Sequence, residues 1–138
     1  MGTLFESILS GQIPSHCVAQ GESWYAFLDI FPRREGHTLV IPRKAVQRLS
    51  ELNSQELNGL MEGITEVQQR LGTHFSTTDF TVCLHDGPLA GHEVPHVHFH
   101  VLPRTQGAVS YPHLTLPTIL RVYTSVGAVS LPNNMTPL

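Results

Sequence analysis

The sequence predicts a single α+β domain, with an antiparallel sheet of about five strands, one long helix and one short helix. Two observations lead to this prediction. Four segments read as strands from their apolar, β-branched and aromatic residues, and a fifth, residues 15–20, looks extended before a turn. Two other segments begin with a capping box, a pattern typical of a helix start. The strand-like segments span residues 15–20, 24–30, 37–42, 79–85 and 96–103.

The short helix is expected to begin after Thr3 and to end near Ser10, where a glycine follows. Thr3 and Glu6 stand three residues apart, so the hydroxyl can cap the Glu6 amide while the glutamate reaches back to the Thr3 amide. Phe5 and Ile8 share one face of this helix. That face is equally consistent with ordinary core and with the wall of a ligand pocket.

The strands at 24–30 and 37–42 carry two polar residues of interest. Asp29 lies where the first of them ends. An acidic residue in this place can cap the following turn or accept hydrogen bonds from ribose hydroxyls, and composition alone favours the turn. His37 opens the second strand, which Pro42 ends. By itself His37 is typical of an ordinary surface histidine.

The long helix is expected to follow Asn53, which forms the second capping box with Glu56, and to end near Gly72. Apolar residues recur at spacings of three and four along it. They are Leu57, Leu60, Met61, Ile64, Val67 and Leu71. Such a stripe indicates core packing, so this helix is expected to cover one face of the sheet.

The last strand contains three histidines that alternate with apolar residues, His96-Val97-His98-Phe99-His100-Val101-Leu102-Pro103. Successive side chains of a strand point to opposite faces, so the imidazoles share one face, with neighbours roughly 6.5–7 Å apart. The apolar face can be buried against a helix while the histidines line a cleft. Because each charge disfavours the next, the three rings are not all protonated at neutral pH. At least one ring is then neutral and nucleophilic.

Nucleophilic attack on phosphorus is the chemistry that suits this arrangement. The middle ring, His98, can attack an α-phosphate if one nitrogen is neutral and the other is held by a hydrogen bond. His100 can neutralise charge on the phosphoryl oxygens, and the backbone carbonyl of His96 can help to shape the cleft. The loop at 86–92 contains two glycines, which allow main-chain N–H groups to approach an anion closely.

A zinc site is the alternative reading of the three histidines, because zinc binds imidazole readily. The outer two of them lie about 13 Å apart on a straight strand, too far to share one ion. Two histidines together with a distant residue remain possible ligands. We expect no metal ligand and no cofactor here.

The motif His-φ-His-φ-His-φ-φ, in which φ is apolar, resembles the signature of the histidine-triad (HIT) family. The resemblance covers about residues 5–104. Further blocks that carry it are residues 5–8, 11–14, 26–30, 36–42 and 86–91. It implies a HIT-like fold for residues 1–105 and a two-fold homodimer that pairs through the long helix and a strand.

The resemblance also implies an enzyme that attacks the α-phosphate of a purine nucleotide and releases a nucleoside monophosphate, as a hydrolase or nucleotidyl transferase. The catalytic group is then His98, His96 and His100, with His37 as a fourth, supporting histidine. The family places a base pocket at Phe5 and Ile8 and a ribose-binding residue at Asp29. The implied nucleotide-binding residues are Phe5, Ile8, Leu28, Asp29, Ile30, His85, Gly91, His92 and Glu93.

Two histidines depart from the family pattern. His92 stands where many relatives carry Gln, and His85 stands where Asn or Gln is usual. A neutral histidine donates one hydrogen bond where an amide offers two. Unlike an amide, however, His92 can also give a proton to a leaving group, which is the role we predict for it.

Two substrate classes remain open. The segments 86–88 and 102–104 resemble the fragile-histidine-triad branch, which cleaves dinucleoside polyphosphates. The segment 36–42 resembles the general branch, which acts on nucleoside phosphoramidates. We favour a general purine-nucleotide hydrolase. A non-catalytic nucleotide-binding protein and a metal hydrolase with histidine ligands are the alternatives of other classes.

Composition bounds the partners and the compartment. A formal charge of −3 with 8 Lys and Arg residues argues against a nucleic-acid-binding surface. No apolar run approaches 18 residues, so no membrane partner is expected. Cys17 and Cys83 form no CxxC pair and are expected to be free thiols, which indicates a cytoplasmic protein.

Residues 106–138 are expected to form a tail separate from the domain. They contain one charged residue, Arg121, many Ser, Thr and Pro residues, and no helical period. A short strand at 119–123 is one reading of this segment, and a poorly ordered tail is the other.

Overall fold

The computed structural model describes residues 2–106, and within them it confirms the α+β prediction. The helices are α1 (Leu4–Leu9) and α2 (Ser54–Phe75), with single 3-10 turns η1 (Leu49–Glu51) and η2 (Pro88–Ala90). The strands are β1 (Cys17–Gln20), β2 (Trp24–Leu28), β3 (Thr38–Pro42), β4 (Asp79–Leu84) and β5 (Phe99–Arg104). The tail expected at 106–138 lies outside the described residues from residue 107 onward.

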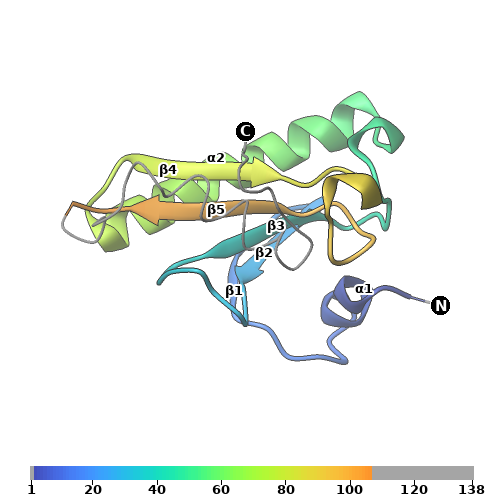
Figure 1. Ribbon diagram of the computed structural model, residues 1–138, viewed down its shortest axis with the longest axis horizontal. Helices are drawn as coiled ribbons and strands as arrows, with labels where there is room; N and C mark the ends of the chain where they lie inside the picture. The colour runs from blue at the N-terminus through green and yellow to red at the C-terminus, as the bar shows by residue number, and fades with distance from the viewer. Residues whose placement is uncertain (1, 107–138) are drawn as a thin grey trace.

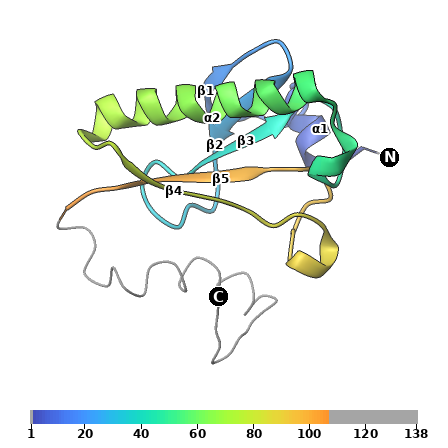
Figure 2. The ribbon, with the colours of Figure 1, turned by 90° about the horizontal axis from the view of Figure 1, so that it is seen from above.

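The five strands form one sheet in the order β1-β2-β3-β5-β4 (Figure 1). Every pair of neighbouring strands is antiparallel. The strand that contains His100, β5, is therefore held on both sides, by β3 and by β4. The long helix α2 lies along one face of the sheet (Figure 2).

Alternation of side chains along the strands divides the core in two. Ala26 and Val40 face α2 and belong to the larger core. Their neighbours Phe27 and Leu39 face the other way and pack with Phe5 of α1. The sheet thus separates a large core beneath α2 from a smaller one beneath α1, and it is on the α1 side that the site is found.

Two glycines let α2 approach the sheet closely. A Cβ atom added at Gly63 would lie 2.7 Å from the ring of Trp24 on β2, and one added at Gly59 would lie 2.2 Å from the hydroxyl of Ser23. Both distances are shorter than atoms tolerate. The Ser23 hydroxyl can rotate away from position 59, but the buried Trp24 ring cannot, so position 63 requires glycine. Glycine weakens a helix interior, and burial of the Trp24 ring against α2 offsets that loss.

Both capping boxes are present, but the long helix differs from its prediction at two points. It continues past Gly72 to Phe75, because the cap is Ser76 in the left-handed conformation and the Gly72 carbonyl accepts from the amides of Ser76 and Thr77. Met61, expected in the core stripe, is 48% exposed because it flanks that stripe. Among the described residues no helix is both long and apolar enough to cross a membrane.

The strand predicted to begin at His96 begins at Phe99 instead. The amides before it bond to loop carbonyls, His96 to Val94 and Val97 to Val46, so residues 96–98 stay outside the ladder. The predicted division of faces is nevertheless confirmed. Val97 and Val101 are buried in the α2 core, while the histidines face the α1 side.

Candidate active site

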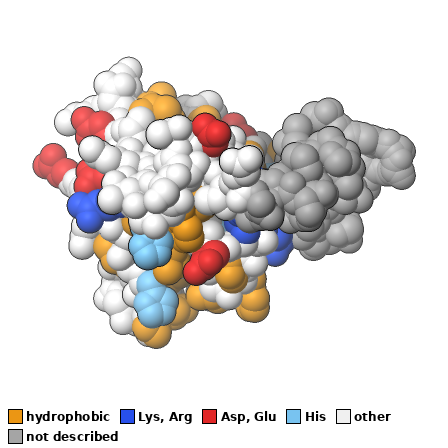
Figure 3. Space-filling model, turned by 90° about the vertical axis from the view of Figure 1, so that its left-hand side faces the viewer, with side chains coloured by type: hydrophobic (Ala, Val, Ile, Leu, Met, Phe, Trp, Pro, Cys, Tyr) orange, Lys and Arg blue, Asp and Glu red, His pale blue; other side chains and the backbone are white. Residues whose placement is uncertain are grey.

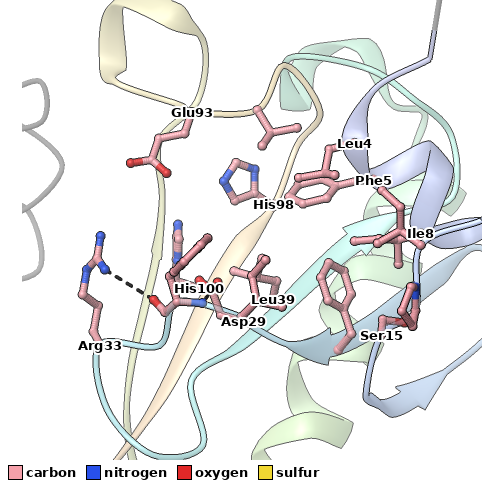
Figure 4. Close-up of a pocket in the computed structure, with 16 residues that line it drawn as sticks. Leu4, Phe5, Ile8, Ser15, Asp29, Arg33, Leu39, Glu93, His98 and His100 are labelled. Atoms are coloured by element: carbon pink, nitrogen blue, oxygen red, sulfur yellow. Dashed lines mark hydrogen bonds between the residues drawn. The ribbon is translucent and has the colours of Figure 1, made fainter.

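A cavity of about 200 Å³ opens between α1, the loop after β2 and the histidines (Figure 4). One end is apolar and is walled by Leu4, Phe5 and Ile8 of α1. The other end is polar and contains His98 and His100. Seen from outside, histidine and apolar side chains gather on one face of the molecule (Figure 3). The cavity can therefore hold a ligand with one flat apolar part and one charged part.

His98 lies at the polar end of the cavity, and a hydrogen bond to the main chain determines its tautomer. Its Nδ1 lies 2.8 Å from the carbonyl oxygen of His96. A carbonyl only accepts hydrogen bonds, so Nδ1 carries the hydrogen and Nε2 carries the lone pair. Burial and the neighbouring histidines together lower the pKa of His98 to about 4, although the hydrogen bond to the His96 carbonyl opposes this shift. The ring is thus neutral at physiological pH, with a nucleophilic nitrogen.

His100 takes its tautomer from a chain of two hydrogen bonds. The amide of Arg33 donates to Nδ1 of His37 at 3.1 Å, so in the neutral ring Nε2 of His37 carries the hydrogen. This Nε2 lies 2.9 Å from Nδ1 of His100, which accepts and leaves the His100 hydrogen on Nε2. Burial lowers the pKa of His37 to about 4 and that of His100 well below 6.5.

The expectation that His100 neutralises charge on the phosphoryl oxygens stays a prediction, and its lowered pKa indicates that the ring meets these oxygens in the neutral form. A buried ring beside two other imidazoles is neutral, because charging it would cost desolvation and repulsion. What His100 offers at the polar end of the cavity is a neutral N–H donor.

His96 is fully buried and does not line the cavity. Its Nε2 lies 2.9 Å from the carbonyl oxygen of Pro42, and its Nδ1 lies 3.0 Å from the hydroxyl oxygen of Thr3. Its backbone carbonyl is the group that accepts from His98. That geometry agrees with the expectation that His96 acts through its main chain.

Asp29 follows β2 and lines the cavity. Its Oδ1 accepts a hydrogen bond from the Phe31 amide at 3.0 Å, which is the turn-capping role that composition favoured. Its Oδ2 lies 3.5 Å from Nε2 of His37. Burial raises the pKa of Asp29, although the Phe31 amide and Arg33 oppose this shift. One carboxylate therefore caps the turn and also faces the site.

Five of the nine predicted nucleotide-binding residues line the cavity: Phe5, Ile8, Asp29, Ile30 and Glu93. Phe5, Ile8 and Ile30 line it, and the Phe5 ring meets His98 edge-on with centroids 5.1 Å apart. Leu28 does not line it. Alternation along β2 places Phe27 on the cavity side, so Leu28 points to the opposite face.

The loop before the triad forms a second, smaller recess against His98 and His100. His85, Gly91, His92 and Glu93 line this recess, and Glu93 also lines the main cavity. Nδ1 of His85 lies 3.0 Å from the carbonyl oxygen of Ala90, so it donates and holds the loop. Gly91 has φ +94°, a conformation that favours glycine, and this turns the chain back toward the triad.

Three polar side chains of the site, besides several apolar wall residues such as Leu4, were missed by the sequence analysis. The side chains of Arg33 and Ser15 line the cavity, and Ser15 is hydrogen-bonded to the hydroxyl of Tyr25 at 2.7 Å. Thr3 was identified only as a helix cap, yet it also contacts His96. The sequence contained one indication for Arg33, because it lies in the turn between two predicted site residues, Asp29 and His37. Sequence alone offered no signal for the other two contacts.

One group of described residues has the composition of a metal site. Ligand atoms of Asp29, His37 and His100 lie within 4.8 Å of one another. The two imidazole nitrogens concerned are 2.9 Å apart and hydrogen-bonded to each other. An ion would have to break this bond, so the donor set fits a hydrogen-bond relay better than a metal site. No group that unites the three triad histidines is found among the described residues.

Comparisons with known proteins agree with this geometry. The family model described as HIT domain matches residues 10–107. An uncharacterized HIT-like protein of Methanocaldococcus jannaschii is 40% identical over 107 residues, which cover 75% of this chain and 80% of that protein. The crystal structure of a Hit-like protein from Bartonella henselae superposes with a TM-score of 0.71 at 29% identity, covering 77% of this chain and 81% of that one.

Two relatives with named activities differ in what they act on. A bis(5'-nucleosyl)-tetraphosphatase of Schizosaccharomyces pombe is 41% identical over 85 residues, 62% of this chain. This chain spans 47% of that protein. An adenosine 5'-monophosphoramidase of Saccharomyces cerevisiae is 34% identical over 101 residues, 73% of this chain and 61% of that enzyme.

Proposed function

This chain belongs to the HIT family, and we propose that it is a hydrolase or nucleotidyl transferase that attacks the α-phosphate of a purine nucleotide with His98. The product is a nucleoside monophosphate. The observation that carries the proposal is the neutral ring of His98, with Nε2 unprotonated, between an apolar cavity and a glycine-containing loop. The existence of hydrolases among its relatives supports it.

The two ends of the cavity suit the two ends of a nucleotide. The base lies between the α1 side chains Phe5 and Ile8 and the opposite wall, which includes Ile30. The ribose hydroxyls donate to the carboxylate of Asp29. The α-phosphate then lies between His98 and the recess of the triad loop, whose main-chain amides act as fixed donors.

In the first step, Nε2 of His98 forms a bond to the α-phosphorus and the leaving group departs with its electron pair. His100 donates its Nε2–H to a phosphoryl oxygen, and His92 gives a proton to the leaving group. The carbonyl of His96 holds the Nδ1–H of His98 and stabilises the positive charge that develops on this ring. The result is a nucleotidyl-histidine.

In the second step, water attacks the phosphorus and the bond from phosphorus to Nε2 breaks. His98 regains its lone pair, one proton of the water returns to His92, and the nucleoside monophosphate is released. The same residues therefore serve both steps with their roles reversed. Replacement of water by another acceptor would give nucleotidyl transfer.

We favour nucleoside phosphoramidates over dinucleoside polyphosphates as substrates. The relative from Saccharomyces cerevisiae supports this choice, and the relative from Schizosaccharomyces pombe supports the second class. The two classes differ only in the leaving group. Steady-state kinetics with adenosine 5'-phosphoramidate and with diadenosine triphosphate separate them. A higher kcat/KM for diadenosine triphosphate would contradict this choice and would favour dinucleoside polyphosphates as the substrate class.

The central experiment traps the intermediate. Wild-type protein and the variant His98→Ala are mixed with a substrate labelled at the α-phosphorus and quenched in alkali, because a phosphorus–nitrogen bond is labile to acid. We expect labelled protein only with His98 present, and loss of turnover by at least about a thousandfold in the variant. His74→Ala, at an exposed position of α2, is the matched control.

A result in which neither protein is labelled or turns over substrate, while both bind nucleoside monophosphate, would support the non-catalytic alternative. Activity that disappears with a chelator and returns with a metal would support the metal hydrolase instead. Each outcome contradicts nucleophilic attack by His98.

We also propose a homodimer that pairs through α2 and the edge of the sheet. Strand β4 lies at one edge of the sheet, and the side chain of Val82 on it is 39% exposed. Met61, on the flank of α2, is 48% exposed. An exposed apolar side chain on the edge strand of the described sheet, together with one on the flank of the helix, suits an isologous contact. A monomer mass in light scattering at micromolar concentration would contradict it.

A cytoplasmic location is a further part of the proposal. Both cysteines, Cys17 and Cys83, are free thiols in the structure. Free thiols are typical of reducing compartments. Fractionation of cells that produce the protein with an epitope tag tests the location, and recovery outside the cytoplasm would contradict it.

A further inference from the structure

His96 has a role that its position does not make obvious. Its ring is fully buried and does not line the cavity, so it does not touch a ligand there. Both of its ring nitrogens are nevertheless engaged. Nε2 must donate to the carbonyl of Pro42, because that oxygen only accepts. The neutral ring has one hydrogen, so Nδ1 must accept, and the hydroxyl of Thr3 must donate to it.

The hydroxyl of Thr3 therefore both accepts and donates a hydrogen bond. As the N-cap of α1 it accepts the hydrogen bond of the Glu6 amide at 3.1 Å. At the same time it donates its single hydrogen to Nδ1 of His96 at 3.0 Å. A hydroxyl has one donor and two acceptor positions, so it can do both. A carboxylate can cap the helix equally well but cannot donate.

The contact matters because residues 96–98 have no ladder to hold them. Strand pairing on both sides begins at Phe99. The carbonyl of His96, which orients His98, is therefore held by two sets of contacts: the Val97 amide of the same peptide unit donates to Val46 at 2.8 Å, and the His96 side chain makes contacts of its own. Its side chain is anchored to the end of β3 on one side and to α1 on the other.

A second contact links α1 to the same residues. The ring of Phe5, two positions after Thr3, packs edge-on against both His96 and His98, with centroids 5.5 Å and 5.1 Å apart. The start of α1 thus contacts the nucleophile ring directly and its supporting carbonyl indirectly.

We propose that Thr3 is a positioning residue: its hydroxyl donates to Nδ1 of His96 and so fixes the carbonyl that orients His98. The consequence for turnover rests on the proposed function. The hydrogen bond between Thr3 and His96 and the tautomers of the two rings are independent of the proposed function, because they are properties of the protein without substrate.

Three substitutions separate this role from helix capping. Thr3→Ser keeps both the donor and the acceptor. Thr3→Asp keeps the cap but offers no hydrogen. Thr3→Val removes both while it keeps the shape of the side chain. Asn53→Ala removes the equivalent cap of α2, which has no contact with the triad, and so reports what loss of a helix cap does by itself.

The first measurement is a two-bond correlation spectrum of the histidine ring nitrogens in the full chain without substrate. We expect the Nε2–H tautomer for His96 and the Nδ1–H tautomer for His98 in wild type and in Thr3→Ser. In Thr3→Asp, we expect His96 to become doubly protonated at pH 7, because both of its partners then only accept. In Thr3→Val, we expect His98 to populate its other tautomer as well.

The second measurement is turnover of adenosine 5'-phosphoramidate. We expect kcat to fall at least about tenfold in Thr3→Val with KM within about twofold, since misplacement of a reacting group acts on the chemical step. Thr3→Ser and Asn53→Ala are expected to retain the wild-type kcat.

Several outcomes would overturn the proposal: an Nδ1–H tautomer for His96 in wild type, a single unchanged His98 tautomer in Thr3→Val, or equal kcat in Thr3→Val and Thr3→Ser. If wild type turns over no nucleotide, the proposed function fails. The spectra then still decide whether Thr3 orients His98.

Discussion

At the scale of single residues, the buried histidines are controlled by main-chain groups. The carbonyl of His96 fixes the hydrogen of His98, and the amide of Arg33 fixes that of His37 and, through it, that of His100. Burial then keeps these rings neutral. The proposed nucleophile, His98, is thus unprotonated before any substrate arrives, and the proposed reaction needs no separate base to activate it.

His92 is expected to set the alkaline limit of activity. A proton donor must be protonated, so turnover falls as pH rises through its pKa, which burial and the charge of Arg48 place below 6.5 in spite of Asp86. In His92→Gln we expect about a hundredfold lower kcat and no such decline, because an amide transfers no proton. Kinetics with the phosphoramidate between pH 5 and 9 measure both.

His74→Gln is the control for this change, since His74 lies exposed on α2. It is expected to leave the pH profile as in wild type. An unchanged rate and an unchanged profile in His92→Gln would remove His92 from the mechanism.

At the scale of elements, the two helices have different tasks. The short helix α1 supplies the apolar wall of the cavity and reaches the triad through its first residues. The long helix α2 supplies the main core and is held close to β2 by its glycines. Strand β5 and the three residues before it, 96–98, lie between the helices, with the histidines facing α1 and with Val97 and Val101 facing α2.

Gly63→Ala is expected to destabilise the fold even though alanine is the better helix former. The new Cβ would lie 2.7 Å from the ring of Trp24, and overpacking of this kind typically costs about 1–3 kcal/mol. The free energy of unfolding in urea measures the effect. Asn58→Ala, at an exposed position of the same helix, should be neutral or slightly stabilising. A stabilised Gly63→Ala protein would contradict the close packing of α2 on β2.

At the scale of the whole molecule, burying neutral histidines makes stability depend on pH. The unfolded chain binds protons at its histidines near pH 6.5, whereas folded His37 and His98 bind them only near pH 4. Between these values the unfolded state carries more protons, so stability falls as pH is lowered. Asp29 acts in the opposite direction, because burial raises its pKa.

The free energy of unfolding is accordingly expected to be nearly constant between about pH 7.5 and pH 8.5 and to decrease toward pH 4, with His37 and His98 each contributing on the order of 3 kcal/mol at the lower limit. Urea denaturation at several pH values measures this. The slope should be smaller in His37→Gln and unchanged in His74→Gln. A stability that rises on acidification would contradict neutral, buried rings.

Much of the fold was predictable because its signals are local. The capping boxes at Thr3 and Asn53 predicted both helix starts correctly. The alternation of histidine and apolar residues from 96 to 103 predicted which side chains are buried under α2 and which face the α1 side. Where prediction failed, distant contacts decided. The amide of Val97 bonds to Val46 and delays the strand start, and Ser76 rather than Gly72 ends α2.

The candidate site was predictable as a set of residues but not as an arrangement. Three histidines in alternation require a shared face, and their number implies that they cannot all be charged. Only the folded chain brings the Arg33 amide to His37, the Thr3 hydroxyl to His96 and the cavity to His98.

By itself, then, the sequence determined the elements, the faces and the chemistry that the histidines are able to perform, because these follow from spacing along one chain. The tertiary structure decided which nitrogen of each ring carries its hydrogen and which ring meets the cavity. Those outcomes depend on main-chain groups and burial contributed by segments far away in the sequence.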